Sequence, residues 1–324
     1  ARTIISSIYL PEKKMIDDCK LLGMGMWALG LFYSKLRRIR KGNSFDVTIE
    51  ILDHFERAVE TAKNMGWSDL IVARSLPELL AAQSAGKTVI IHAVEGAHSL
   101  AGNIDNLKKL YDRGVCMITL AHFYENEATQ TVGGIPDDKK ILGCFRNSKE
   151  QGGGLSTFGK QLVEEMIRLG MLIDLTHCTP LARMEIFQIN GNRRPLVFSH
   201  SGVGALNSHH MNPSDEEIKL VAECGGVIGI IFMNHWLAPG KQKNGLDLLV
   251  KTIWHIIEKG GIESIAIGSD FDGFTDPPDD IKDASEYSNL VYALENDGFT
   301  DAEIEKILNK NATRVMEKGW DKKL

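Results

Sequence analysis

Short apolar runs alternate along the chain with longer segments in which apolar residues recur at helical spacing. Near-continuous apolar runs of this length are typical of strands in a parallel sheet that is buried on both faces. We predict eight strands, at residues 2–6, 24–32, 88–95, 115–122, 171–177, 195–200, 226–232 and 264–270. A shorter run at residues 70–73 is interpreted as a segment that flanks a helix.

The helical segments lie between these runs, at residues 47–65, 76–86, 103–114, 156–170, 180–190, 214–225 and 246–260. Ser214, followed three residues later by Glu217, is typical of a capping box at a helix start. Eight strand–helix units joined by right-handed crossovers predict an α/β protein, a (β/α)8 TIM-like barrel that forms a single domain over residues 1–324. An open doubly wound sheet is the alternative fold.

Two longer connections interrupt the alternation, at residues 33–46 and 123–155. The second follows the carboxyl end of a predicted strand. Because the active sites of barrels are built at that end, we expect residues 123–155 to form a long loop on the active-site side.

Composition excludes some classes of function. The 324 residues are 43% hydrophobic and 25% charged with a net charge of −6, which disfavours binding to nucleic acid or to anionic membrane. The basic run at residues 35–42 is interpreted as a solvated loop or helix face. Five scattered cysteines indicate reduced thiols.

No apolar run reaches the ~18 residues that span a bilayer, and neither a leader nor an anchor signal occurs in the sequence given. We therefore expect a protein without a membrane anchor, and the reduced thiols indicate the cytoplasm. The sequence leaves open whether the chain forms a homo-oligomer.

Five of the eight predicted strands end on a residue that can bind a metal or carry a proton. These residues are Glu95, His122, His177, His200 and Asp270. Each alone has a structural explanation, such as a histidine bonded to backbone or an aspartate that caps a turn. Together they indicate a metal site, because strand ends converge on one face of a barrel. Imidazoles and a carboxylate suit zinc, which lowers the pKa of bound water towards ~7, and a further carboxylate can transfer the proton.

Longer motifs surround these residues: "VEGAHSL" (94–100), "LAHFYEN" (120–126), "GLSTFGKQLVEEMIRLGMLIDLTHC" (154–178), "FSHSGV" (198–203) and "IGSDFDGF" (267–274). In this combination and order the chain resembles the membrane (renal) dipeptidase family, a branch of the metal-dependent amidohydrolase superfamily. The resemblance implies a TIM-like barrel with a two-metal site, usually zinc, that hydrolyses dipeptides and some β-lactams.

The resemblance also implies roles for single residues. Glu95 resembles the carboxylate that bridges the metals, and His177 and His200 resemble ligands of one metal ion. His122 resembles the contact of the substrate oxyanion. Asp270 resembles the carboxylate that transfers the proton to the leaving amine.

The chain departs from the family at the first strand, where a His-x-Asp pair that binds the other metal is followed by Leu-Pro. When the family motif is aligned on Leu10 and Pro11, Ser7 and Tyr9 occupy the positions of that pair. Neither is a good zinc ligand, so we expect one ion rather than two, with another divalent metal as the alternative to zinc. His210 lies near the position of the family's substrate-binding arginine, and a histidine binds a carboxylate in a pH-dependent way.

The sequence therefore predicts a metal-dependent hydrolase that cleaves the amide bond of a dipeptide or a similar small substrate by metal-activated water. Two alternatives remain at this point. One is a catalytically silent barrel that has lost its metal and binds a ligand or a partner, and the other is a mononuclear amidase or lactonase.

Overall fold

The structure is a computed structural model, and it describes residues 2–18, 30–133, 152–239, 245–273 and 276–320. The chain divides into two compact units. The first contains Ala1–Ile173, His177–Ile189 and Trp320–Leu324, and the second contains Asp174–Thr176 and Asn190–Gly319. That residues 1–324 form a single domain stays a prediction.

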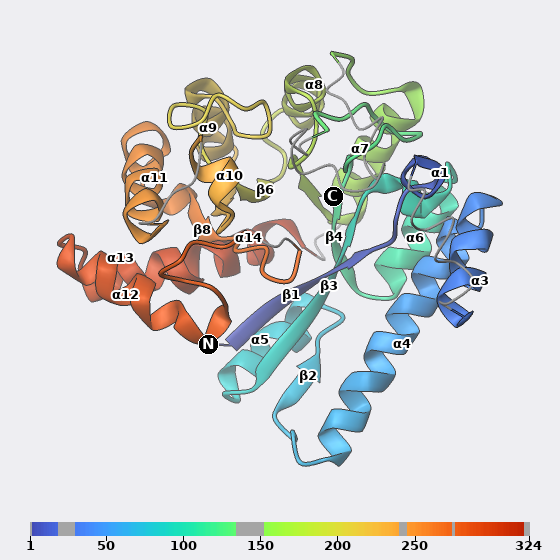
Figure 1. Ribbon diagram of the computed structural model, residues 1–324, viewed down its shortest axis with the longest axis horizontal. Coiled ribbons are helices and arrows are strands. Elements are labelled where there is room, and N and C mark those ends of the chain that lie inside the picture. Colours follow the sequence, from blue (N-terminus) through green and yellow to red (C-terminus); the bar gives the residue numbers. More distant parts are fainter. Residues whose placement is uncertain (1, 19–29, 134–151, 240–244, 274–275, 321–324) are drawn as a thin grey trace. The chain divides into compact units, whose positions relative to one another are not determined.

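Parallel strands form the centre of the first unit (Figure 1). They are β1 (Arg2–Tyr9), β2 (Leu70–Val72), β3 (Thr88–Glu95), β4 (Val115–Thr119) and β5 (Leu172–Asp174, whose last residue belongs to the second unit). The strand order is β1-β3-β4-β5, and β2 also pairs with β3. The pairing of β1 with β3 runs from Arg2 opposite Thr88 to Tyr9 opposite Glu95, so these two strands end side by side.

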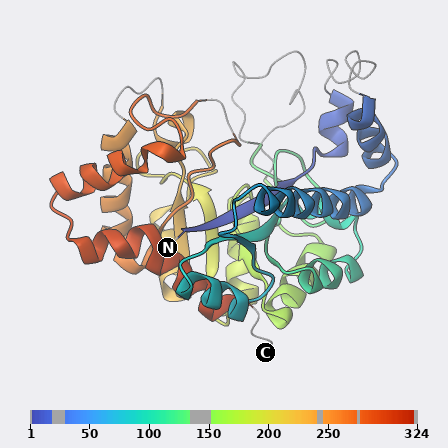
Figure 2. The same ribbon diagram turned by 90° about the horizontal axis from the view of Figure 1, so that it is seen from below.

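Helices follow the strands of this unit. They are α1 (Lys13–Asp18), α3 (Gly30–Arg40), α4 (Ser44–Asn64), α5 (Leu76–Ser84), α6 (Asp105–Asp112), α7 (Thr157–Leu169) and α8 (Pro180–Asn190), with a short 3-10 helix, η1 (Ala97–Leu100). Helix α4 is the longest and contacts β1, β2 and η1 (Figure 2). A separate apolar cluster joins the end of β1 to the first helices, and its members are Leu10, Ile16, Leu36, Ile39 and Val47.

The second unit contains β6 (Leu196–Ser201), β7 (Val227–Ile230) and β8 (Ile265–Ile267), which also pair in parallel in this order. Its helices are α9 (Asp215–Glu223), α10 (Asn234–Leu237), α11 (Gly245–Gly260), α12 (Tyr287–Asn296), α13 (Asp301–Glu305) and α14 (Asn311–Gly319), with short turns of other helix types at η3 (Ile262–Ser264), η4 (Ala284–Glu286) and η5 (Lys306–Lys310). The capping box predicted at Ser214 and Glu217 is confirmed at the start of α9.

Seven of the eight predicted strands correspond to observed strands, and the prediction at 24–32 is wrong where the structure describes it. Residues 24–29 lie outside the described residues, and residues 30–32 begin helix α3. Helix α3 extends into the predicted connection at 33–46 as far as Arg40, and helix α4 begins at Ser44 within the same connection. Leu36 and Ile39, three positions apart, bury one face of α3. The basic residues between them lie on its more exposed face, as predicted for the run at 35–42.

The short run at residues 70–73 is a strand, not a segment flanking a helix. Leu70–Val72 pairs with the first residues of β3. Backbone pairing defines such a three-residue strand, and a pattern of three side chains is too short to show it.

The described part of the predicted loop at 123–155 has only isolated bridges, from Thr129 to Leu155 and from Thr131 to Cys178. Among the described residues, Cys116, Cys178 and Cys224 are buried and take part in no disulfide, and the other two cysteines lie outside the described residues. Within the described parts, no helix is long and apolar enough to cross a membrane.

Candidate metal centre

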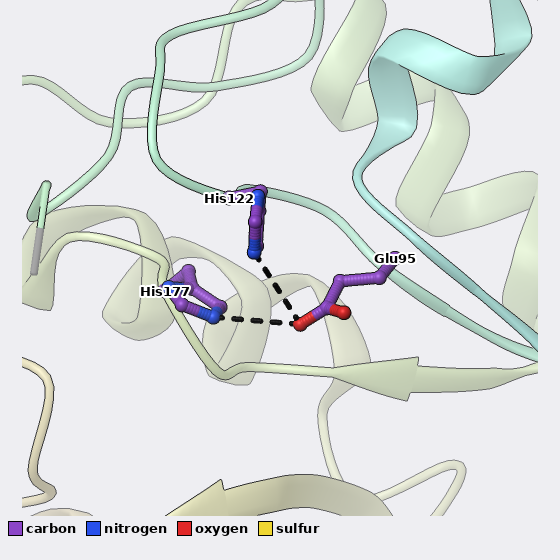
Figure 3. Close-up of side chains that lie close together, drawn as sticks. All are labelled: Glu95, His122 and His177. Atoms are coloured by element: carbon purple, nitrogen blue, oxygen red, sulfur yellow. Dashed lines mark ion pairs between the residues drawn. The ribbon is translucent and has the colours of Figure 1, made fainter. Parts of the chain in front are cut away.

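Three of the predicted site residues meet in the first unit: Glu95, His122 and His177 (Figure 3). Glu95 is the last residue of β3. His122 and His177 are each the third residue after a strand, β4 and β5 respectively. Their donor atoms all lie within 4.8 Å of one another. The convergence that the sequence predicts for these three strand ends is therefore observed.

The distances within this cluster fit a shared metal ion better than direct bonds between the side chains. Oε1 of Glu95 lies 3.5 Å from Nε2 of His177 and 3.7 Å from Nε2 of His122. Both distances exceed the 2.7–3.2 Å of N–H···O hydrogen bonds. Zinc bonds of ~2.0–2.1 Å in tetrahedral geometry separate two ligand atoms by about 3.3–3.4 Å. One carboxylate with two imidazoles is also a donor set that zinc prefers, so the residues present fit such an ion.

One threonine fixes the backbones that carry both histidines. The Thr131 hydroxyl donates a hydrogen bond to the carbonyl oxygen of His122 and lies 3.3 Å from the carbonyl oxygen of His177. It also accepts a hydrogen bond from the backbone N–H of Gly133. His177 has a φ of +65°, a region that is uncommon for residues other than glycine. The described start of the 123–155 loop therefore determines where the two imidazoles lie.

Glu12, a carboxylate that was not predicted as a site residue, contacts the cluster through Nδ1 of His122, the ring nitrogen that does not face Glu95. The Glu12 side chain is only 4% exposed. Oε1 lies 3.0 Å from Nδ1 of His122 and accepts a hydrogen bond from the backbone N–H of Phe123. Oε2 accepts a hydrogen bond of 2.9 Å from the hydroxyl of Tyr9. Glu12 thus connects the end of β1 to the segment that follows β4.

Electrostatics keep Glu12 ionised and Tyr9 protonated. Burial alone would raise the pKa of the Glu12 carboxyl, but the attraction of His122 and the hydrogen bond between them lower that pKa to about 2. Burial, together with the negative charge of Glu12, raises the pKa of the Tyr9 hydroxyl well above 10.0. The Tyr9 ring also lies against the His122 ring, with 4.5 Å between centroids.

Leu10 fixes the segment that carries Tyr9 and Glu12 through two contacts, one of its side chain and one of its carbonyl oxygen. The Leu10 side chain is fully buried in the cluster with α1, α3 and α4. Its carbonyl oxygen lies 2.8 Å from Nε2 of His98, a buried residue of η1. These contacts place Glu12 at the start of α1, facing His122.

Ser7 and Tyr9 occupy the positions of the expected metal-binding pair. The two residues lie in different surroundings. Ser7 is exposed on β1, whereas Tyr9 lies opposite Glu95 in the strand register. An aromatic ring therefore takes the place of the expected carboxylate beside the cluster.

The other predicted site residues belong to the second unit. His200 lies in β6, where its Nδ1 is 2.8 Å from the hydroxyl of Ser199 and its ring stacks on Trp236. Asp270 is the third residue after β8 and has a φ of +59°, and His210 is exposed. The roles predicted for His200, Asp270 and His210 stay predictions.

The sequence contains a signal for one of the two supporting residues, Glu12, and none for the other, Thr131. Glu12 directly follows the Leu-Pro pair that marks the end of the first strand, so a carboxylate there, close to a missing ligand, was a usable signal. Thr131 has no such signal, because its role depends on the backbone carbonyl oxygens of two residues, His122 and His177, that only the folded chain brings together.

Parallel strands followed by helices, with a carboxylate and two imidazoles gathered beyond the strand ends, define a candidate metal-binding protein of the α/β-barrel class. The family model described as membrane dipeptidase, peptidase family M19, matches residues 5–322. The chain therefore belongs to the membrane dipeptidase family, a family of metal-dependent dipeptidases.

Curated relatives agree with this assignment. An uncharacterized dipeptidase of Schizosaccharomyces pombe is 31% identical over 278 residues, which is 84% of this chain and 62% of the relative. A second uncharacterized dipeptidase of the same yeast is 33% identical over 223 residues, or 68% of this chain and 51% of the relative. The chain thus spans only about half to three fifths of the length of these relatives.

Solved structures show the fold. A metallopeptidase from Rhodobacter sphaeroides, liganded with a phosphinate mimic of the dipeptide L-Ala-D-Ala, matches with a TM-score of 0.78 at 21% identity and covers 98% of this chain and 86% of its own. A probable dipeptidase from Pseudomonas aeruginosa matches with a TM-score of 0.73 at 23% identity and covers 85% and 80%. The fold class is α/β of the TIM-like barrel type, as predicted.

Proposed function

We propose that this chain is a metal-dependent hydrolase that cleaves the amide bond of a dipeptide or of a similar small substrate. Membership of the membrane dipeptidase family supports the reaction class. The cluster of Glu95, His122 and His177 carries the proposal, because it offers three donor atoms within 4.8 Å of one another at the carboxyl ends of neighbouring strands.

Glu95 and His177 would hold the metal, and zinc is the ion that we propose. When bound, such an ion acidifies a water molecule and polarises the carbonyl group of the substrate. The chain's own residues would do the rest. Glu12 and Thr131 orient the histidine at position 122, and the rings of Tyr9 and Phe123 pack against it.

The remaining roles are proposed from the resemblance. His200 would be a further ligand and Asp270 the group that transfers a proton to the leaving amine. His210 would contact the substrate carboxylate.

One ion, rather than two, is favoured by the end of β1. Tyr9 lies opposite Glu95 in the register, and its hydroxyl is directed to Glu12. A phenol that keeps its proton because burial raises its pKa is a poor metal ligand. We therefore propose a mononuclear centre, which also keeps lactones and other amides among the candidate substrates.

The substrate proposal starts from dipeptides. The related structure from Rhodobacter sphaeroides holds a mimic of L-Ala-D-Ala, and we propose that this chain takes substrates of the same size. A panel of free dipeptides that includes L-Ala-D-Ala, assayed beside N-blocked dipeptides and simple lactones, tests this.

The decisive experiment measures metal and activity together. Protein purified without chelator is analysed for transition metals by mass spectrometry and is then assayed before chelation, after chelation and after zinc is added back. We expect about one equivalent of metal and reversible loss of dipeptide hydrolysis, and we expect Glu95→Gln to lose both. His54→Asn, on the exposed side of α4, is the matched control. If the reconstituted protein contained no metal and hydrolysed no dipeptide, that result would favour the catalytically silent barrel.

A further inference from the structure

Arg183, a residue of helix α8, lies in the interior of the first unit. It is only 1% exposed, and it is among the largest fully buried residues of the described chain. An arginine is almost never fully buried unless its guanidinium is paired, because removing the charge from water is costly. The contacts of this guanidinium must therefore offset that cost, and one of them lies beside a proposed metal ligand.

We propose that Arg183 is a positioning residue for His177. It holds the turn between β5 and α8 in the backbone conformation that directs the His177 imidazole at Glu95. The inference rests on the proposed function, because His177 is a proposed ligand of the metal ion.

The backbone of His177 is in the left-handed region, with a φ of +65°. This region is strained for a residue that has a Cβ atom, and the strain persists only where the surrounding contacts hold it. Figure 3 shows the imidazole directed at an oxygen of Glu95, at a distance of 3.5 Å. If φ returned to the usual negative range, the Cβ atom would point elsewhere and the imidazole would leave Glu95.

Two consecutive carbonyl groups of this turn are held from different sides. The carbonyl oxygen of His177 accepts the backbone N–H of Val132 at 3.2 Å and lies 3.3 Å from the hydroxyl of Thr131. The next carbonyl oxygen, that of Cys178, accepts a 2.9 Å hydrogen bond from Nη1 of Arg183. The 123–155 loop therefore fixes the first carbonyl group, and helix α8 fixes the second.

The helix that carries Arg183 is itself fixed where it begins. The Thr179 hydroxyl accepts the backbone N–H of Ala182 at 3.1 Å, as an N-cap does, and donates to the carbonyl oxygen of Gly153 at 2.6 Å. The backbone N–H of Arg183 donates to the carbonyl oxygen of Thr179 at 3.0 Å. The guanidinium thus reaches back from a capped first turn onto the residue directly after His177.

The chemistry of the guanidinium suits this role. A carbonyl oxygen only accepts hydrogen bonds, and a guanidinium only donates them. Arginine keeps its charge in proteins and presents its donors in a rigid plane, so the contact with Cys178 does not depend on a titration. A lysine could supply one flexible donor at the same place, and a methionine could supply none.

Three variants test the role of Arg183. Arg183→Met keeps an unbranched apolar side chain, which suits a buried position, and removes every donor. Arg183→Lys keeps the charge and a donor that can reach the carbonyl oxygen of Cys178. Arg57→Met makes the same chemical change as the first variant at an exposed position of α4 and is the matched control.

The His177 backbone is read from NMR chemical shifts, which report φ in the metal-free protein without substrate. We expect a positive φ in the wild type and in Arg183→Lys, and the loss of this conformation in Arg183→Met. Zinc affinity is then measured by competition with a chromophoric chelator. We expect Arg183→Met to bind zinc about 10- to 100-fold more weakly and to change the visible spectrum of the cobalt-loaded protein. Arg183→Lys should lie between the two, and Arg57→Met should match the wild type.

A measurement on the wild type keeps the inference testable if Arg183→Met does not fold. In protein labelled with ¹⁵N, a guanidinium held by the Cys178 carbonyl oxygen should give separate, slowly exchanging signals for its Nη groups. A single averaged signal would mean that the guanidinium rotates freely and does not hold the turn, which would overturn the inference.

The outcomes separate this inference from the proposed function. If Arg183→Met folds, keeps a positive φ at His177 and binds zinc as the wild type does, the inference is overturned and the hydrolase stands. If the wild type binds zinc but cleaves no dipeptide, the proposed function falls, whereas weaker zinc binding by Arg183→Met would still support the role of Arg183. If the wild type binds no metal, both proposals fall.

Discussion

The hydroxyl of Tyr9 donates a 2.9 Å hydrogen bond to Oε2 of Glu12, a carboxylate that is almost fully buried. A hydrogen bond to a buried charge contributes more than one between neutral groups, because the unpaired charge would be left without water. The pair also links two consecutive elements, the last residue of β1 and the residue before α1. Tyr9 is therefore a structural residue at a position where the resemblance to the family predicts a metal ligand.

Tyr9→Phe tests this assignment, because it removes the hydroxyl and keeps the ring that lies against His122. We expect the free energy of unfolding to fall by about 1.5–3 kcal/mol, the usual value for a hydrogen bond to a charged group. Urea unfolding followed by circular dichroism measures the change. Tyr292→Phe, at a residue that is 67% exposed, should have no measurable effect. Equal stabilities for the two variants would contradict the role given to the Tyr9 hydroxyl.

Thr131→Val tests the connection between the two histidine segments. Valine has nearly the shape of threonine but leaves the His122 carbonyl oxygen and the Gly133 N–H without this partner. We expect a loss of about 1–3 kcal/mol in the free energy of unfolding and weaker zinc binding, since the imidazoles lose a shared support.

The control for this substitution is Thr61→Val on the exposed side of α4, where the hydroxyl donates only to the carbonyl oxygen of Arg57 in the same helix. Differential scanning calorimetry of the zinc-free and zinc-loaded proteins measures both effects. An unchanged zinc-dependent rise in melting temperature in Thr131→Val would mean that the hydroxyl does not position the histidines.

Much of the fold was predictable from the sequence because strands and helices leave different periodicities. The runs at 88–95 and 195–200 correspond to β3 and β6 within one residue at each end. The prediction at 24–32 failed because an uninterrupted apolar run does not distinguish a strand from a buried helix segment. Only the continuation into Leu36 and Ile39 reveals the helical spacing of α3.

The candidate site was predictable as a set of strand ends but not as a network. Glu95, His122 and His177 follow from reading the strand ends together. Glu12 does not, because its partner His122 lies 110 positions away in the sequence. Hydrogen bonds of such long range leave no periodic pattern, so only the folded chain shows that the carboxylate after Leu-Pro faces His122.

A close backbone approach fixes α7 against the loop that carries Thr131. A Cβ atom built on Gly159, in the first turn of α7, would lie 2.1 Å from the carbonyl oxygen of Ala128. That oxygen already accepts the N–H of Ser156 and cannot turn away. We expect Gly159→Ala to destabilise the protein by about 1–3 kcal/mol through overpacking, although alanine favours helices more than glycine does.

Gly152→Ala is the matched control, since nothing lies within 4 Å of the added atom. Chemical unfolding of both variants measures the difference. If the Gly159 variant were as stable as the wild type, α7 would be free to move away from Ala128, and the close approach would not define the position of the loop.

His92 gives the protein a pH-dependent stability that is separate from the metal cluster. Its side chain is fully buried in β3, next to Glu56 at 3.7 Å. Burial lowers the pKa of His92 below 6.5, with Arg113 and Arg74 acting in the same direction and Glu56 opposing them. In the unfolded chain this histidine takes up a proton near pH 6.5, so below that pH the unfolded state binds more protons than the folded state. The contribution to stability is therefore complete above about pH 6.5 and is lost as the pH falls.

His92→Leu removes this titration and fills most of the same space. We expect the free energy of unfolding of the wild type to decrease below pH 6.5 with a slope of at most about 1.4 kcal/mol per pH unit from this residue, and we expect the slope to be smaller in the variant. Urea unfolding at a series of pH values between 5 and 8 measures it, with His54→Leu on the exposed side of α4 as the control that keeps the wild-type slope. Parallel curves for wild type and His92→Leu would show that the folded protein protonates His92 as easily as the unfolded chain does.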